Sequence, residues 1–420
     1  MVLQWFTRDI SRFAVLIAAL FLASGDLRAL PQFTLLTGNK CLNCHITPQG
    51  SGLRNELGWY MAKDMALLSA HTLGLQFIEK AETNSLADGA LTLGFDARVQ
   101  MTRSPRISTA ETRFIPMQTS VYAAWALAPW LTLEGMADIG SLARLAAGAG
   151  LPFIGQQAWM ASALIQPGLT LPQLRIGHFQ PSIGLRYDDH TMLVRQVAGA
   201  NTIPIIAPNF AEYGAELNYD GVQWLSLTAG VFLPRSLAQT RTVNRFGEST
   251  PLFGDTLAMA AAASNLGELV KTPSYLLRAY VLPRTEDHTM TGILGASFFV
   301  NQSFSMANIF AGIGLSDRVS LQGEYAISGV REGRQTRNYS VMLTYQAFPW
   351  LLPFARFEQG RTQVSDPNTA SGVAELYSTQ AVVGVQLFPI PFVELRPEFR
   401  FYDTETFTAT RWNLQLHLFY

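Results

Sequence analysis

Residues 91–101, LTLGFDARVQM, decide how this chain folds. Apolar side chains occupy the odd positions, from Leu91 to Met101, and mostly polar ones occupy the even positions, among them Asp96 and Arg98. An alternation with a period of two predicts a β-strand with one apolar and one polar face. In water the apolar face would pack on a core, whereas in a membrane barrel it faces lipid and the polar face lines the lumen.

The same alternation returns up to the C-terminus. Further strands are predicted near 113–127, 130–142, 156–166, 172–180, 210–220, 222–233, 274–284, 291–300, 304–316, 318–329, 337–348, 350–361, 376–388, 391–402 and 408–420. With the first strand the total is about sixteen, an even number that is usual for bacterial barrels. We therefore expect an all-β membrane protein, an antiparallel transmembrane β-barrel.

The connections between these strands alternate in length. Short turns are predicted at 128–130, 219–221, 316–317, 348–350 and 388–391, and long connections at 181–209, 234–273 and 362–375. Short periplasmic turns and long outer loops are typical of outer-membrane barrels. Aromatic residues beside the short turns predict a girdle at the periplasmic interface: Trp130, Phe348, Trp350 and Phe388. Residues 256–270 are predicted to form a helix within a long loop.

Composition agrees with a membrane barrel. Hydrophobic residues make up 48% of the chain and charged residues only 15%, and the net charge is -1. A soluble domain carries roughly 25% charged residues, so much of this surface need not face water. The last strand alternates down to the aromatic Tyr420, which resembles the C-terminal insertion signal of outer-membrane proteins. The alternative is a soluble β-sandwich or propeller, which would need more turn residues at both ends of its strands.

The N-terminus predicts export. Arg8 and Arg12 precede an apolar stretch at 13–23, and small residues follow at 23–25 and again at Ala29. This order indicates a signal peptide over residues 1–29, and the alternative is an uncleaved membrane anchor. Export would place the rest of the chain in the periplasm or the outer membrane.

Both cysteines lie in one motif, Cys41-Leu42-Asn43-Cys44-His45. This is the C-x-x-C-H pattern of c-type haem attachment, in which the thiols bond the haem and the histidine ligates its iron. A disulfide or redox pair would not explain the adjacent histidine, and zinc would need two more ligands nearby. We therefore predict one haem c per chain, bound covalently by Cys41 and Cys44 with His45 as the axial ligand.

A helix is predicted over residues 53–70, LRNELGWYMAKDMALLSA, where apolar residues recur at spacings of three and four. It could cover the second face of the haem. Candidates for the sixth iron ligand are Met61, Met65 and His71, and a five-coordinate iron is the alternative. His71 is favoured because no other histidine lies between His45 and residue 178.

A charged cluster follows the strand that ends near residue 180. The side chains of His178, Asp188, Asp189 and His190 are candidates for a site in the lumen or in a loop. Such a cluster could coordinate a cation, order a loop inside the pore or accept a metal substrate. The alternative is a solvated loop held by salt bridges. We see no Ser-His-Asp arrangement or phosphate-binding loop, and so predict no catalytic residues.

Residues 33–58, FTLLTGNKCLNCHITPQGSGLRNELG, resemble the start of the fused cytochrome–porin proteins of bacterial outer membranes. The shared pattern is Thr37-Gly38, the haem motif, a Pro/Gly stretch and a helix containing glycine. The family carries one haem in a short N-terminal segment before a barrel, and it includes iron-oxidising members. Residues 46–50 depart from those members, so the resemblance leaves the electron donor open.

The resemblance implies a cytochrome c-like α-helical segment at 30–85 and an outer-membrane barrel at 86–420, with the haem segment in the periplasm or the barrel mouth. Electron transfer between an extracellular metal or small molecule and periplasmic cytochromes is the first hypothesis. The alternative is a porin-type transporter of small solutes, with the haem segment as a plug or sensor. A third is an oxidoreductase whose haem reacts with a small molecule that enters the lumen. Oxidation of ferrous iron is the enzyme activity considered, and an electron carrier is favoured over a classical enzyme. The lipid bilayer is an expected partner and nucleic acid is not.

Overall fold

The computed structural model covers the whole chain and describes most of the segments after residue 30. The described residues are 31–50, 52–81, 83–103, 112–138, 159–168, 170–187, 189, 192–199, 205–206, 210–233, 241–243, 249–251, 272–287, 289–302, 304–330, 334–365 and 372–420. The predicted signal peptide and the predicted helix at 256–270 lie outside this part of the chain.

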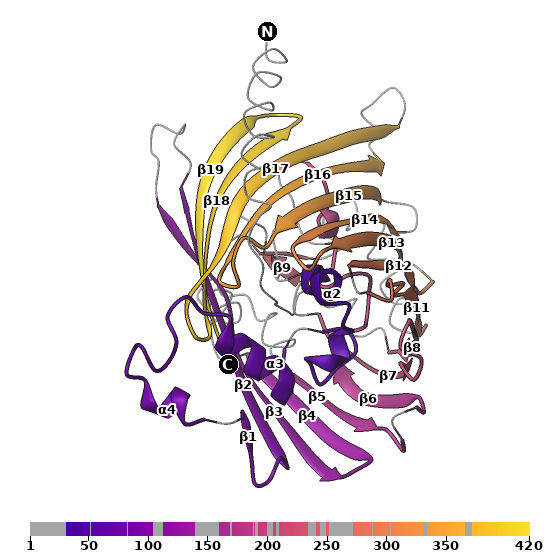
Figure 1. The fold of residues 1–420 in the computed structure, drawn as a ribbon. Helices are drawn as coiled ribbons and strands as arrows, with labels where there is room; N and C mark the ends of the chain where they lie inside the picture. Colours follow the sequence, from indigo (N-terminus) through magenta and orange to yellow (C-terminus); the bar gives the residue numbers. More distant parts are fainter. Residues whose placement is uncertain are drawn as a thin grey trace.

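Sixteen antiparallel strands form a closed barrel (Figure 1). They are β2 (Leu91–Arg103), β3 (Arg113–Ala128), β4 (Leu131–Asp138), β5 (Trp159–Ile165), β6 (Gln173–Phe179), β7 (Glu212–Tyr219), β8 (Leu225–Phe232), β11 (Ser274–Val281), β12 (Met290–Val300), β13 (Phe304–Leu315), β14 (Val319–Val330), β15 (Arg334–Tyr345), β16 (Leu351–Ser365), β17 (Val373–Ile390), β18 (Val393–Thr404) and β19 (Thr408–Phe419). The last strand pairs with β2, and β8 pairs with β11, so no edge is left open. The predicted fold class and all the predicted strands are confirmed. The short β1 (Ser85–Leu86) pairs with the start of β2, and β9 (Arg241–Val243) pairs separately with β10 (Ser249–Pro251).

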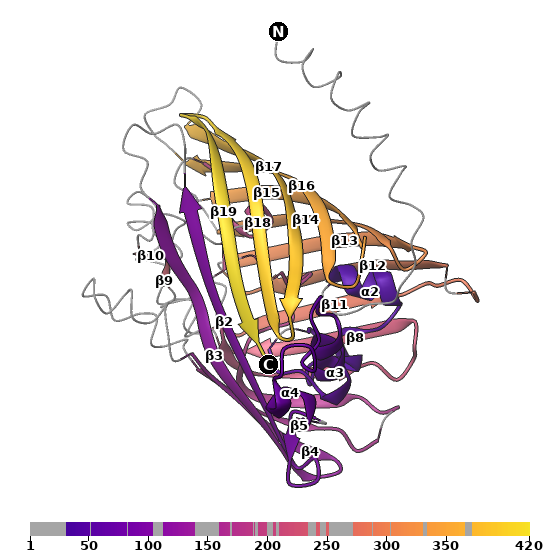
Figure 2. The same ribbon diagram turned by 60° about the vertical axis from the view of Figure 1, so that its left-hand side comes forward.

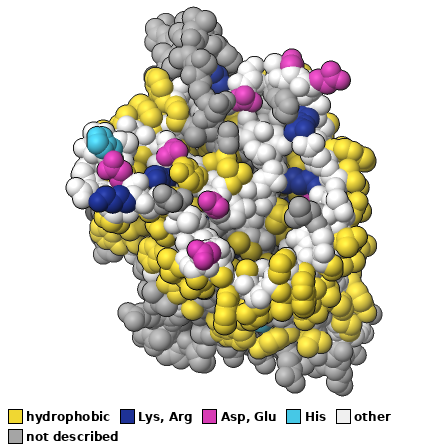
Figure 3. Space-filling model, turned by 60° about the horizontal axis from the view of Figure 1, so that its bottom comes forward, with side chains coloured by type: hydrophobic (Ala, Val, Ile, Leu, Met, Phe, Trp, Pro, Cys, Tyr) yellow, Lys and Arg dark blue, Asp and Glu magenta, His cyan; other side chains and the backbone are white. Residues whose placement is uncertain are grey.

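The barrel wall is polar on its inside and apolar on its outside. In β2, Asp96, Arg98 and Gln100 are buried, whereas Leu93 and Val99 are exposed. In Figure 3, apolar side chains gather over the lower part of the view, and the visible charged side chains lie above them. A soluble protein buries its apolar face, so this inverted pattern indicates a barrel surrounded by lipid. No helix among the described residues is long and apolar enough to cross a bilayer.

The two ends of the barrel differ as the connection lengths predict. The tight turn between β13 and β14 has positive φ at Ser316 and Asp317, and the backbone N–H of Arg318 donates to the carbonyl of Leu315 at 3.0 Å, as in a type I′ turn. The C-terminus lies at this short-turn end, and Figure 2 shows it beside α3 and α4. At the opposite end, the connection from β6 to β7 spans 180–211, and that from β8 to β11 includes β9 and β10. The connection after β16 is shorter than predicted, because the ladder to β17 continues from Ser365 to Val373.

The N-terminal segment contains short helices: α2 (Pro31–Thr37), the 3-10 turn η1 (Cys41–Asn43), α3 (Glu56–Asp64) and α4 (Gln76–Glu79). The predicted helix at 53–70 is correct only for its central part. The chain leaves the helix at Met65 because the backbone N–H groups of Leu67 and Leu68 donate to the carbonyls of Phe388 and Pro389. Contacts with the end of β17 thus replace a further helical turn.

An apolar cluster fixes this segment inside the short-turn end. Trp59 of α3 is fully buried and packs on Phe392 and Tyr420, with ring centroids 5.4 and 5.8 Å away. Phe388 belongs to the same cluster and is buried, so its predicted place in the aromatic girdle is wrong. Phe388 turns inward because it packs on side chains of the N-terminal segment. Trp130 and Phe348 are exposed, as predicted.

Candidate functional site

The Cys-x-x-Cys-His motif forms a tight turn at the short-turn end of the lumen. The backbone N–H groups of Cys44 and His45 both donate to the carbonyl of Cys41, at 3.1 and 2.9 Å. Just before the motif, the ammonium of Lys40 donates to the carbonyls of Val222 and Leu225 and contacts the Asp220 carboxylate at 3.1 Å. These bonds fix the motif to the turn between β7 and β8.

Helix α3 packs directly on the motif. Asn55 caps the helix by accepting from the backbone N–H of Gly58, and its side-chain amide donates to the carbonyls of Leu42 and Asn43. A Cβ at Gly58 would collide with the backbone carbonyl of Cys44, so glycine is required for this close approach. The two elements therefore form one rigid unit.

A cavity of about 840 Å³, partly open to solvent, lies between this unit and the barrel wall. Cys41, Cys44 and His45 all line it. The other lining residues come from α2, the loop after the motif, the lumen segment and strands β2, β11 and β12: Phe33, Thr34, Thr37, Asn39, Lys40, Gln49, Gly50, Gly52, Arg54, Asp96, Arg98, Leu185, Arg186, Arg278, Tyr280 and Ile293.

The charges around this cavity are mostly positive. Among the described residues that line it, Lys40, Arg54, Arg98, Arg186 and Arg278 carry positive charge. The only carboxylate among them is that of Asp96, which pairs with Arg98 at 2.9 Å. Arg278 is 6% exposed, and its Nε and Nη1 have no hydrogen-bond acceptor among the described residues. A buried guanidinium with unused donors favours an anionic occupant.

The residues present fit a c-type haem. Two thiols and an imidazole supply the bonds and the axial ligand, and the arginines are suited to the haem's two carboxylates. At Gly50, whose φ is +73°, a Cβ would stand only 3.3 Å from the Cys41 sulfur, so glycine leaves room beside the thiol. Burial raises the pKa of the Cys41 thiol, although the nearby Arg278 charge acts in the opposite direction.

The three candidates for the sixth ligand occupy different surroundings. Met61 is buried with its sulfur 3.7 Å from the Cys44 sulfur, and Met65 is buried in the apolar cluster around Trp59. His71 has 83% of its side chain exposed, and its Nδ1 contacts Glu79 at 2.8 Å. None of the three lines the cavity that contains His45. The choice of sixth ligand stays a prediction.

The charged cluster predicted near residues 178–190 is divided between two environments. His178 faces the outside of the barrel, where it is buried against Trp159 and Tyr213, with ring centroids 4.3 and 4.6 Å away and ring planes tilted by 41°. Strand alternation decides this, since Arg175 on β6 faces inward and His178, three residues later, shares the outer face with exposed Tyr213. The prediction that His178 and Asp189 share one site is therefore wrong. Asp188 and His190 lie outside the described residues.

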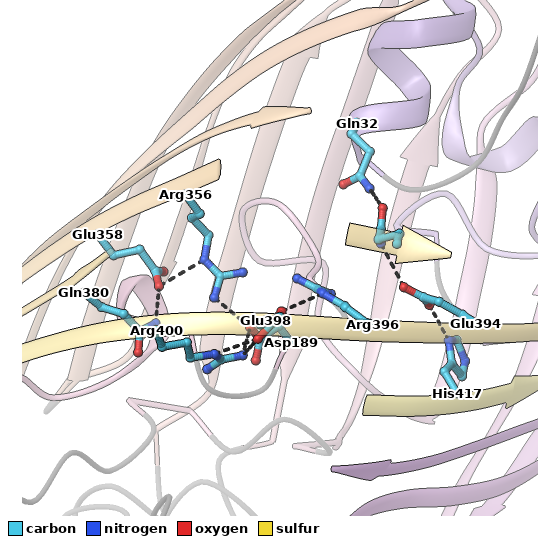
Figure 4. Close-up of polar contacts among 11 residues, drawn as sticks. Gln32, Asp189, Arg356, Glu358, Gln380, Glu394, Arg396, Glu398, Arg400 and His417 are labelled. Carbon is cyan, nitrogen blue, oxygen red and sulfur yellow. Dashed lines mark hydrogen bonds and ion pairs between the residues drawn. The ribbon is translucent and has the colours of Figure 1, made fainter. Parts of the chain in front are cut away.

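Asp189 is buried in the lumen, where it joins a network of charges. Its carboxylate accepts from Arg356 of β16 at 2.7 Å and from Arg400 of β18 at 3.0 Å (Figure 4). Glu358 and Glu398 pair with the same two arginines. Of the alternatives predicted for this cluster, the geometry favours a loop that is ordered inside the pore. The described part of the chain contains no group of three or more His, Cys, Asp or Glu side chains that could hold a metal ion.

Further bonds hold the rest of this lumen segment, residues 181–199, to the wall. Ser182 donates to Glu216 through both its N–H and its hydroxyl, and Arg195 pairs with Glu324 at 2.8 Å. The side-chain amide of Asn338 donates to the carbonyls of Leu193 and Gln196. The sequence did not predict these contacts. Strand alternation places the wall residues on the inner face of the barrel, but it does not show which residues of the lumen segment they contact.

Comparison with known proteins finds likeness only among solved structures. No family model matches the chain, and no curated protein matches it. OmpT of Vibrio cholerae is 10% identical over 80% of this chain and 100% of its own, with a TM-score of 0.49. OprB of Pseudomonas putida is 10% identical over 79% and 95%, also at 0.49, and the outer membrane channel DcaP of Acinetobacter baumannii is 9% identical over 79% and 97%, at 0.47. Likeness at this level carries no argument about function.

Proposed function

We propose that this protein is an outer-membrane barrel that carries one covalently bound haem c in its lumen and transfers electrons through it. The observation that carries the proposal is the inner cavity lined by Cys41, Cys44 and His45. Cys41 and Cys44 would hold the haem, and His45 would ligate its iron. Bound there, the haem would supply one-electron chemistry inside the barrel. Buried Arg278 would favour its carboxylates.

The packing of the lumen would narrow a path for solutes, as the electron-transfer proposal expects. The described residues of the segment 181–199 are bonded to β7, β14, β15, β16 and β18, so these residues lie across the lumen. Hydrocarbon about 30 Å thick separates the two sides of the membrane, and electrons need a relay inside it. A periplasmic cytochrome or other carrier would dock at the short-turn end, and a metal or small molecule would react from outside.

The test begins with haem content. The purified protein is expected to show a covalent haem in its alkaline pyridine spectrum, lost in Cys44→Ala. The protein is then placed in liposomes that hold a trapped electron acceptor, and ferrous iron is added outside. Reduction of the haem and then of the acceptor supports the proposal. Asp287→Ala, in an exposed turn between β11 and β12, serves as the control that should behave like the unmodified protein.

The second candidate function is transport of small solutes. It is favoured by the closed sixteen-strand barrel with a polar inner face, an architecture that can enclose an aqueous channel. Under this hypothesis the haem segment acts as a plug or sensor. Conductance in planar bilayers separates the two: steady channels in a protein whose haem never reduces a trapped acceptor would favour transport and reject the relay.

A further inference from the structure

A second cavity of about 470 Å³, partly open to solvent, lies beside the first, on the other side of the loop that follows the haem motif. The loop residues Gln49, Gly50 and Gly52, together with Arg186, line both cavities. The remaining wall is built by the loop and by strands β3–β6, which contribute Tyr122, Glu134, Met136, Met160, Ser162 and Arg175. None of the haem-motif residues belongs to it.

Arg175 is the polar anchor of this cavity. It is 3% exposed, its Nε donates to the hydroxyl of Ser162 at 3.1 Å, and its Nη2 pairs with Glu134. The guanidinium carbon lies 4.2 Å above the ring of Phe179, which fixes the plane of the group. Its Nη1 has no acceptor among the described residues. A fixed, buried guanidinium with a free edge is suited to a carboxylate oxygen.

Much of the rest of the cavity wall is apolar, and it determines what kind of group the remainder of the ligand can be. Leu53, Tyr122 and Met136 form one apolar cluster, against which Ile46 and Met160 pack. Such a surface accepts a flat or compact apolar group, and methionines adapt to its shape. Arg186 adds a second positive charge at the boundary with the first cavity, while the Glu134 carboxylate is already committed to Arg175 and Ser162.

We infer that this cavity binds a small monocarboxylic acid with an apolar body, whose carboxylate contacts Arg175 Nη1 and whose body packs on Met136 and Met160. Among the described residues, the charges near the carboxylate position are Arg175 and Arg186, against Glu134 and against Glu216, which lies opposite Arg175 on β7. This inference does not depend on whether haem is bound. The ligand would be separated from the haem motif by the loop that contains Gln49, Gly50 and Gly52.

The experiment measures binding of benzoate to the purified full chain in detergent by equilibrium dialysis. Benzamide, which has the same ring without the charge, is the paired ligand. We expect saturable binding of one benzoate per chain, with benzamide weaker by about tenfold or more because the charge-assisted hydrogen bond is lost. Haem content, measured on the same samples, reports on the proposed function separately.

The variant Arg175→Lys keeps the charge that Glu134 faces but loses the planar donor edge, and it should weaken benzoate binding by about tenfold. Arg318→Lys is the matched control, since Arg318 also has a buried Nη1 without an acceptor among the described residues yet lines neither cavity. Folding of both is checked by the heat-dependent shift in gel mobility. Equal binding of benzoate and benzamide, no saturation, or no loss in folded Arg175→Lys would each overturn the inference.

Discussion

Gly58 shows how one residue sets the geometry of the haem motif. Its Cα faces the Cys44 carbonyl so closely that a methyl group does not fit. We predict that Gly58→Ala pushes α3 away from the motif and lowers covalent haem content several-fold, measured by the alkaline pyridine spectrum. Gly135→Ala is the control, because a Cβ there would meet its nearest neighbour at an ordinary 3.6 Å. Full haem loading in Gly58→Ala would show that the helix contact is dispensable.

His71 is the residue whose surroundings argue most against its predicted role. Its imidazole is largely exposed and paired with Glu79, away from the cavity of His45. We expect His71→Ala to leave the absorption spectrum of the haem unchanged. The measurement is the spectrum of the oxidised and reduced protein, with Met61→Ala compared in parallel. A change confined to His71→Ala would restore the bis-histidine prediction.

The lumen segment is the element on which the choice between relay and channel rests. Asp189 gives both Arg356 and Arg400 an acceptor, and each arginine also keeps a glutamate. We predict that Asp189→Ala lowers the free energy of unfolding by about 1–3 kcal/mol, as the loss of a buried acceptor does. It should also raise conductance in planar bilayers, as the segment loosens from the wall.

The control for this element is Arg361→Ala. Arg361 and Glu375 form an ion pair 3.4 Å long with both side chains more than half exposed, and such pairs contribute about 0–1 kcal/mol. Neither stability nor conductance should change appreciably. If Asp189→Ala behaves like this control, the buried network does not hold the segment in place.

At the scale of the whole molecule, the orientation of the wall is the property to test. Ile309, in the middle of β13, is 59% exposed on the outer face. An arginine there should cost about 2–4 kcal/mol if the surface faces hydrocarbon. Urea titration of the protein folded into lipid vesicles measures this cost. Phe77→Arg, at a 74% exposed position on α4 outside the barrel wall, should cost much less. Equal costs would argue against a lipid-facing wall.

The sequence by itself determined the strands, their inward and outward faces and the alternation of short and long connections. Those features are local: a period of two marks a strand, and the low charge of the chain assigns the apolar face to lipid. The motif Cys41-x-x-Cys44-His45 was equally visible, because its chemistry depends on spacing within five residues.

The tertiary structure alone decided which inner-face charges meet. Asp189 and Arg400 are 211 positions apart, and their contact depends on how the closed barrel curves and on how the segment after Phe179 folds inward. It likewise turned Phe388 inward against the N-terminal segment and ended α3 at Asp64. Each outcome follows from packing between distant segments, which no local pattern encodes.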